Sequence, residues 1–184
     1  LEIHPQGFLP WELIRQINRQ IEEDLELFRE VKKWTSKLKI KSDQYQVVGK
    51  NKNLFIHPSA NIYPSVVFDV KSGPIIIDKN VTITSFSFLE GPLYVAPNAH
   101  IDGARITGGS IIGDTCKIGG EVENSIFENY SNKHHEGFVG HSYVASWVNF
   151  GALSTTSDLK NNYGMIKIPS GLDKINTGTI KFGS

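Results

Sequence analysis

Aliphatic side chains recur at six-residue steps through most of the chain beyond residue 51. The series contains Ile56, Ile62 and Phe68, then Ile77 and Ile83, Val95 and Ile101, then Ile106, Ile112 and Ile118, and finally Val139 followed, after one five-residue step, by Val144 and Phe150. A short strand with one inward aliphatic residue and a tight corner forms one flat side, and three sides close a triangular coil. An antiparallel sandwich would instead show period two, with turns about every 8–12 residues. The pattern therefore predicts stacked coils of a parallel β-helix.

Before the repeat, apolar residues follow a helical period. Pro10 and Glu12 suit a helix start, because proline needs no donor partner there and a carboxylate suits the positive end. The apolar stripe consists of Ile14, Ile17, Ile21, Leu25 and Phe28. We expect an amphipathic helix over residues 10–34. Two interpretations of this helix are open: it binds a partner, or it is a connector that packs on its own domain or on an upstream one. The pattern favours the connector.

Composition narrows the classes of function. The 184 residues include 39% hydrophobic and 21% charged residues, and Lys+Arg and Asp+Glu both number 19, so we expect no nucleic-acid partner. No apolar run reaches the roughly 20 residues of a membrane span, so we expect no membrane partner. The single cysteine, Cys116, suits a reducing cytoplasm and falls at an inward repeat position, which favours core over nucleophile.

We divide the chain into a helix and linker over residues 1–50 and a β-helix domain over residues 51–184. The first residue is Leu1 rather than Met, and the chain ends Lys181-Phe-Gly-Ser. We therefore expect a piece of a longer protein, with a β-helix that is cut short at its carboxyl end.

The repeat fails at residues 128–137 and 154–164, where polar side chains replace it. Irregular segments are the natural sites on an otherwise regular prism. The first contains His134 and His135, and His141 follows soon after. Adjacent histidines on a strand point to opposite faces, and no cysteine or carboxylate joins them at ligand spacing, so we predict no metal site.

Several motifs around these breaks resemble one family. They are GPIIIDKN, GGSIIGDTCKIGGEVENSIF, YSNKHHEGFVGHSYV and SDLKNNYG. Residues 50–184 resemble the hexapeptide-repeat carboxyl half of the bifunctional UDP-N-acetylglucosamine pyrophosphorylase and glucosamine-1-phosphate N-acetyltransferase. The closer likeness is to a divergent branch of sugar nucleotidyltransferases with such a carboxyl half. The helical segment resembles the linker after the nucleotidyltransferase half.

The resemblance implies an all-β fold, the left-handed parallel β-helix, with the N-terminal helix added and the chain assembled as a homotrimer. It also implies acetyl-CoA as acyl donor and an amino-sugar 1-phosphate as acceptor in nucleotide-sugar synthesis. Magnesium belongs only to the upstream nucleotidyltransferase domain. His135, in His-Glu-Gly-Phe-Val-Gly, stands at the position of the catalytic histidine, which removes a proton from the attacking amine.

The same resemblance carries five further residues into the site. They are Arg105 for the sugar phosphate, Phe138 in place of a tyrosine, Asn149 for the sugar, Ala152 at the acetyl-CoA site and Asp158 in place of a catalytic-pocket asparagine.

Arg105 and Asp158 also have simpler structural interpretations. An arginine on a coil commonly forms surface ion pairs, and an aspartate in a loop commonly caps or stabilises that loop. We predict that His134 is a surface histidine in a loop.

Three departures from the family motif support other functions. Leu153 is bulky beside the expected pocket, Glu123 replaces a sugar-binding lysine, and Phe138 lacks a hydroxyl group. They motivate a trimerising scaffold of a sugar-1-phosphate nucleotidyltransferase with a degenerate acyltransferase site. Acyl transfer to a different small amine is a third hypothesis.

Overall fold

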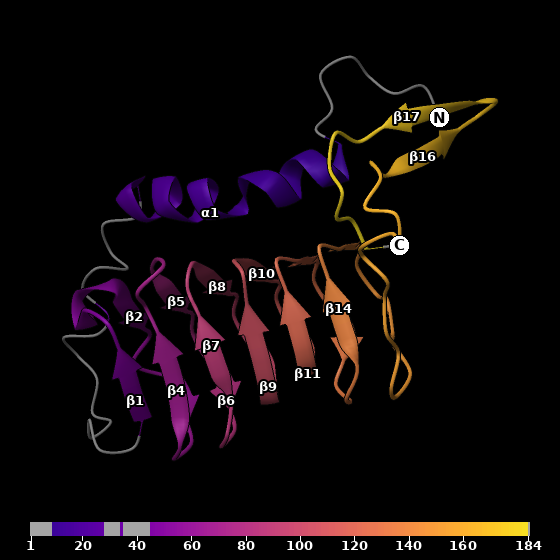
Figure 1. Cartoon of the computed structure of the whole chain (residues 1–184). Helices are drawn as coiled ribbons and strands as arrows, with labels where there is room; N and C mark the ends of the chain where they lie inside the picture. The colour runs from indigo at the N-terminus through magenta and orange to yellow at the C-terminus, as the bar shows by residue number, and fades with distance from the viewer. Residues whose placement is uncertain (1–8, 28–33, 35–44, 184) are drawn as a thin grey trace.

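The structure is a computed structural model that describes residues 9–27, 34 and 45–183 (Figure 1). The helical elements are α1 (Pro10–Leu27) and the 3₁₀ turn η3 (Asn51–Asn53). The strands are β1 (Tyr45–Val48), β2 (Leu54–Ile56), β3 (Asn61–Ile62), β4 (Val66–Asp69), β5 (Ile75–Ile77), β6 (Thr82–Ile83), β7 (Phe88–Glu90), β8 (Leu93–Val95), β9 (His100–Thr107), β10 (Ser110–Ile112), β11 (Lys117–Glu123), β12 (Ile126–Phe127), β13 (Asn132–Lys133), β14 (Phe138–Gly140), β15 (Tyr143–Val144), β16 (Lys167–Ser170) and β17 (Asp173–Asn176).

Parallel pairing between successive coils builds a left-handed parallel β-helix with three faces. Face 1 contains β1, β4, β7, the ends of β9 and β11, and β14. Face 2 contains β2, β5, β8, β10, β12 and β15, and face 3 contains β3, β6, the starts of β9 and β11, and β13. The coils stack side by side along the axis (Figure 1). The predicted fold class is therefore confirmed.

Every strand of the three faces contributes at least one inward residue, and such residues of successive coils stack in a ladder on each face. The ladder of face 1 is Phe68, Leu89, Ile106, Val122 and Val139. That of face 2 is Ile56, Ile77, Val95, Ile112, Phe127 and Val144, and that of face 3 is Ile62, Ile83, Ile101, Ile118 and Lys133. The predicted six-residue series supplies most of these positions, and Phe150 packs against the end of the core. Cys116 is fully buried, as its repeat position predicted.

The coils differ in length, which explains the slips in the repeat. Residues 45 and 66 pair on neighbouring coils, as do residues 118 and 133, so one coil takes between 15 and 21 residues. Glycine is required where a corner brings two coils into close approach. A Cβ atom on Gly119 would lie 1.9 Å from the carbonyl oxygen of His134. This position therefore excludes any side chain.

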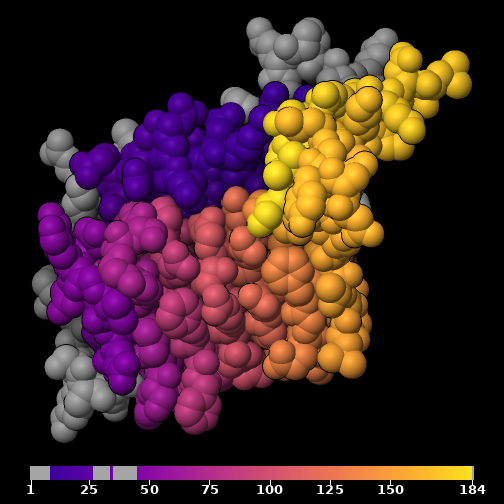
Figure 2. All heavy atoms as spheres, in the orientation of Figure 1, coloured from indigo at the N-terminus to yellow at the C-terminus, as the bar shows by residue number. Residues whose placement is uncertain are grey.

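Helix α1 lies along face 2 and covers it (Figures 1 and 2). The buried side chains of Ile14, Ile17 and Ile21 pack against a row of outward apolar residues. That row is Phe55, Ile76, Tyr94, Ile111, Ile126 and Tyr143, one residue from each strand of face 2. Burial of each isoleucine contributes about 1.5–3 kcal/mol. In the described residues, α1 therefore lies on its own domain, as the connector interpretation predicted.

The predicted helix extended to residue 34; α1 is described over Pro10–Leu27, and Trp34 lies in a turn. Residues 28–33, which include Phe28 of the predicted stripe, lie outside the described residues. No helix that the structure describes is long and apolar enough to cross a membrane.

After β15 the chain begins one more coil and then leaves the prism. Asn149 bridges to Asn132 on face 3, and the backbone N–H of Thr156 donates to the carbonyl oxygen of Phe138 on face 1. The antiparallel hairpin of β16 and β17 then projects beyond the end of α1 (Figure 1). The last described residues return to α1, where the ring of Phe182 meets that of Trp11 edge to face at 6.0 Å.

Candidate functional site

His135, the predicted catalytic residue, lies in the corner between β13 and β14. The same corner one coil earlier is short and passes through Gly120, whereas here the chain inserts His135 and Glu136 before Gly137. The side chain of His135 is exposed, and its imidazole makes no hydrogen bond within the part of the chain that the structure describes. Its ring centroid lies 5.3 Å from that of His134. The corner therefore presents a free imidazole to solvent.

A buried lysine supports this corner from inside the prism. Lys133 takes an inward position of the face 3 ladder and is only 2% exposed. Its Nζ donates to the carbonyl oxygens of Gly119 at 2.7 Å and of His135 at 2.9 Å. Burial lowers the pKa of Lys133, while the nearby charges of Glu136 and Glu121 oppose that shift. The ammonium group therefore holds the backbone of His135 in a fixed position.

Sequence reasoning did not single out Lys133, although a signal was present. Phe127, Lys133 and Val139 are spaced six residues apart, and both neighbours are inward residues of the core. A lysine at an inward repeat position is rare in a protein core, because a buried charge needs polar partners. The charged residue at an inward position therefore distinguishes the corner that contains His135 from a regular turn of the repeat.

The incomplete final coil runs alongside the same corner. The backbone N–H of Leu153 donates to the carbonyl oxygen of Glu136 at 2.8 Å. A Cβ atom on Gly137 would lie 2.1 Å from the carbonyl oxygen of Ser154, so the two segments are in close contact. The predicted polar segment 154–164 therefore begins as the last layer of face 1 and shields one side of the corner.

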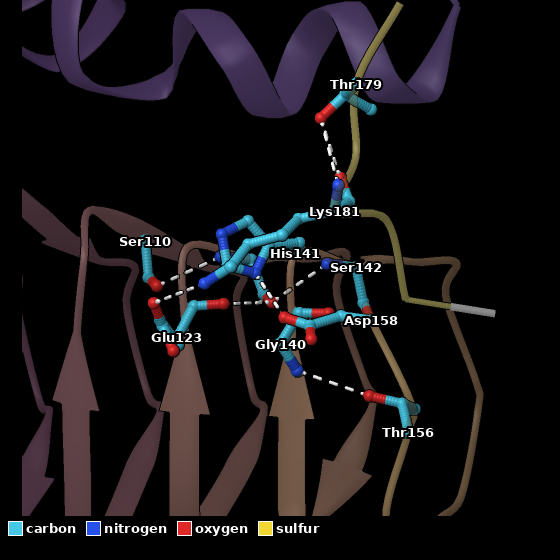
Figure 3. Close-up of polar contacts among 10 residues, drawn as sticks. Ser110, Glu123, Gly140, His141, Ser142, Thr156, Asp158, Thr179 and Lys181 are labelled. Atoms are coloured by element: carbon cyan, nitrogen blue, oxygen red, sulfur yellow. Dashed lines mark hydrogen bonds and ion pairs between the residues drawn. The ribbon is translucent and has the colours of Figure 1, made fainter. Parts of the chain in front are cut away.

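A second histidine lies at the other end of β14, where face 1 turns into face 2 (Figure 3). The Nδ1 of His141 lies 2.6 Å from Oδ2 of Asp158, and these two side chains are only 12% and 13% exposed. A Cβ atom on Gly140 would lie 2.3 Å from Cζ of Phe138 and 2.9 Å from Oδ2 of Asp158. The bare α-carbon of Gly140 thus lets Phe138 and Asp158 meet beside His141. These are two of the predicted substrate-binding residues.

The carboxyl-terminal segment closes over this pair. The backbone N–H of Gly183 donates to the carbonyl oxygen of His141, and that of Phe182 donates to the carbonyl oxygen of Asp158. Lys181 extends toward Glu123, with 3.7 Å between its Nζ and Oε1 of the carboxylate (Figure 3). The His141–Asp158 pair is therefore enclosed by the chain rather than open to a large substrate.

Asp158 also borders a cleft with a volume of about 890 Å³. Residues 157–162, residues 166–169 and Phe182 line the cleft. Its polar side chains include Lys160, Asn161 and Asn162, from the predicted motif SDLKNNYG. The motif that interrupts the repeat therefore forms a wall of the cleft.

The other predicted site residues lie elsewhere. Arg105 is on the outer surface of face 1, where its Nε lies 3.3 Å from Oε1 of Glu121 and its guanidinium lies over the ring of Phe88. Asn149 accepts a hydrogen bond from Asn132 on face 3 at 2.7 Å. Ala152 lies in an exposed turn.

The register of face 1 also separates Arg105 from Phe138. Arg105 pairs with Glu121, and Glu121 pairs in turn with Phe138 on the next coil. Within one chain, the structure brings Phe138 and Asp158 together but leaves Arg105 in a surface ion pair.

Ligand spacing along the chain does not cover contacts between coils. No carboxylate joins the adjacent histidines at ligand spacing along the chain, but Oδ2 of Asp102 lies 2.8 Å from Nε2 of His134. His100 joins these two residues, and the ligand atoms of all three lie within 4.8 Å of one another. Asp102 is 32 residues from His134 along the chain, so no spacing motif indicated the contact.

Comparison with known proteins adds no relative, since no family model and no curated protein matches this sequence. The resemblance to the hexapeptide-repeat acetyltransferases therefore stays a prediction, as do the homotrimer and the cytoplasmic location.

Proposed function

We propose that this β-helix transfers an acetyl group from acetyl-CoA to the amine of an amino-sugar 1-phosphate, with His135 as general base. The observation that carries the proposal is the interrupted corner, where Lys133 anchors the backbone of an exposed and unpartnered imidazole. The motif resemblance places the catalytic histidine at the same residue.

The chemistry requires one group that accepts a proton near neutral pH. The amine attacks the thioester carbonyl, a C–N bond forms, and the C–S bond to coenzyme A breaks. His135 takes the proton from the attacking nitrogen and returns it to the leaving thiolate. A backbone N–H group stabilises the oxyanion of the tetrahedral adduct.

Accessibility favours His135 over the other two histidines nearby. His134 bonds to Asp102, and His141 bonds to Asp158 inside a closed corner. A carboxylate partner is compatible with general base catalysis, but the side chain of His141 is too enclosed for an amino sugar to reach it. The exposed ring of His135 has no such obstacle.

Binding of the acceptor phosphate by Arg105 would require its ion pair with Glu121 to open. Both side chains of this pair are about half exposed, and exposed ion pairs contribute little, so this rearrangement costs about 0–1 kcal/mol. The proposal places the acceptor and acetyl-CoA between neighbouring prisms of a trimer, where a second copy supplies the opposite wall.

The test measures thiol release from acetyl-CoA by the purified protein, with glucosamine 1-phosphate as first acceptor and a panel of small amines after it. We expect His135→Asn to lower the rate by about 100-fold or more, as loss of a general base does. His57→Asn is the matched control, because His57 is another surface histidine with a local partner, Ser59. Equal rates for wild type and His135→Asn would refute His135 as base.

The scaffold hypothesis remains the second candidate, and two observations favour it. Glu121 already forms an ion pair with Arg105, which was predicted to bind the sugar phosphate. The bulky side chain of Leu153 is 76% exposed beside the corner that contains His135. A trimer in sedimentation, without acetyl-CoA binding in calorimetry, would support a trimerising scaffold for a nucleotidyltransferase domain. A monomer would exclude it.

A further inference from the structure

We infer that His100, Asp102 and His134 form a binding site for a divalent transition-metal ion, of which Zn²⁺ is the most suitable, on the outer surface of face 3. In the described residues, these are the only histidine, cysteine and acidic side chains that gather as three potential ligands. The inference is independent of acetyl transfer.

The register of face 3 creates this group. Asp102 pairs with Gly119, and the close approach of Gly119 to the carbonyl oxygen of His134 continues the same row on the next coil. Asp102 and His134 are therefore two coils apart, a backbone separation of about 9.6 Å. Their side chains meet because Gly119, between them, has none. The 2.8 Å contact between Nε2 and Oδ2 follows directly from this gap.

The distances suit a metal ion after small side-chain adjustments. In a tetrahedral zinc site with bonds of about 2.0–2.1 Å, ligand atoms lie about 3.3 Å apart. The ligand atoms here lie within 4.8 Å of one another, and the rings of His100 and His134 meet edge to face at 6.1 Å between centroids. All three residues are at least partly exposed, so their side chains can close on an ion without backbone movement.

A supporting hydrogen bond already orients the carboxylate. Thr84 donates from its Oγ1 to Oδ1 of Asp102 at 2.8 Å, and Thr84 itself accepts from the backbone N–H of Gly103 at 3.0 Å. This leaves Oδ2 directed at His134. Metal-binding carboxylates and histidines are commonly held by such outer hydrogen bonds, which fix the ligand before the ion arrives.

The donor set selects the class of ion. Two imidazole nitrogens and one carboxylate oxygen suit Zn²⁺ and its neighbours in the first transition series, whereas Ca²⁺ and Mg²⁺ prefer oxygen ligands. Three protein ligands leave a coordination position for water or for a group from another molecule. One cation opposes binding, because Lys117 lies in the same face between His100 and Asn132 and is exposed.

The experiment titrates ZnCl₂ into the full chain, purified without a histidine tag, and follows the heat by calorimetry. We expect one zinc ion per chain. His134→Ala, Asp102→Asn and His100→Ala should each weaken binding by at least about tenfold. Lys117→Gln should strengthen it by about twofold to fivefold, because a repelling charge is removed.

His135→Ala is the matched control, since it removes the adjacent histidine, which is not in the group. It should leave zinc affinity unchanged while it lowers acetyl transfer, and this separates failure of one proposal from failure of the other. The thermal midpoint should rise with zinc in wild type and in His135→Ala but not in His134→Ala. No zinc binding by the wild type, or equal affinity of wild type and the three ligand variants, would overturn the site and leave a surface ion pair.

Discussion

Gly119→Ala adds a single methyl group at the most crowded glycine of the face 3 corner. The new Cβ would lie 1.9 Å from the carbonyl oxygen of His134, whereas real Cβ atoms essentially never approach closer than 3.0 Å. The neighbouring coil must therefore retreat by about 1.1 Å. Because the obstacle is backbone, no rotamer change relieves it.

The cost has two parts. Forcing the coils apart is an overpacking effect, which costs about 1–3 kcal/mol. The shift also weakens the hydrogen bonds that join the coils here, including the one from Nζ of Lys133 to the carbonyl oxygen of Gly119, at about 0.5–1.5 kcal/mol each. With two such bonds affected, we expect Gly119→Ala to lower the free energy of unfolding by about 2–6 kcal/mol.

Gly151→Ala is the matched control, because Gly151 follows an inward residue, Phe150, as Gly119 follows Ile118. Its nearest heavy atom is Oγ of Ser154 at 3.8 Å, an ordinary contact. We expect this variant to be neutral or stabilised by about 0.4–1 kcal/mol, because alanine restricts the unfolded chain.

Urea unfolding of wild type and both variants measures the difference in the free energy of unfolding, provided that the slope of this free energy against urea concentration is the same for all three. A loss below about 0.5 kcal/mol for Gly119→Ala, within the range of unremarkable surface substitutions, would refute the close approach of the coils.

Three further predictions concern other parts of the molecule. Burial lowers the pKa of Lys133, so the native state loses this proton before the unfolded state does. The stability of wild type should therefore rise relative to Lys133→Met as the pH increases toward 10.5, and a pH-independent difference in urea unfolding would contradict this. Ile17→Ala should cost about 2–5 kcal/mol in thermal or urea unfolding, because the side chain of Ile17 is only 1% exposed where α1 packs on face 2, while the exposed Arg19→Ala should cost at most about 1 kcal/mol. A hydrogen bond to Glu128 raises the pKa of Tyr143 from its usual value near 10 to about 12. The free energy of unfolding that this hydrogen bond contributes should therefore decrease as the pH rises from 10 toward 12. Absorbance titration of wild type against Tyr143→Phe checks the value, and a phenol that titrates near 10 would disprove it.

The six-residue period was sufficient to predict the fold, because it depends on a local property. Most inward residues are apolar and each strand is short, so Ile56, Ile77 and Ile112 reveal their burial without any knowledge of which coils pair. The amphipathic stripe of α1 could be predicted for the same reason. The surface that the stripe covers could not be predicted, because the outward row of face 2 is assembled from six separate strands.

The site was predictable only in part. The motif resemblance pointed to Phe138 and Asp158, which do meet beside Gly140. It also pointed to Arg105, whose ion pair with Glu121 depends on the register of two coils. The carboxylate partners of the histidines at positions 134 and 141 were missed, because neither contact lies within one coil.

The sequence by itself determined most of the inward apolar residues, where the regular repeat stops, and that a helix with one apolar side precedes it. Only the tertiary structure decided which polar side chains meet on the outer surface. Coil length varies between 15 and 21 residues, so counting along the chain does not give the register between coils. The contact of Asp102 with His134 depends on that register and on the missing side chain of Gly119, and both are properties of stacked coils rather than of any one segment.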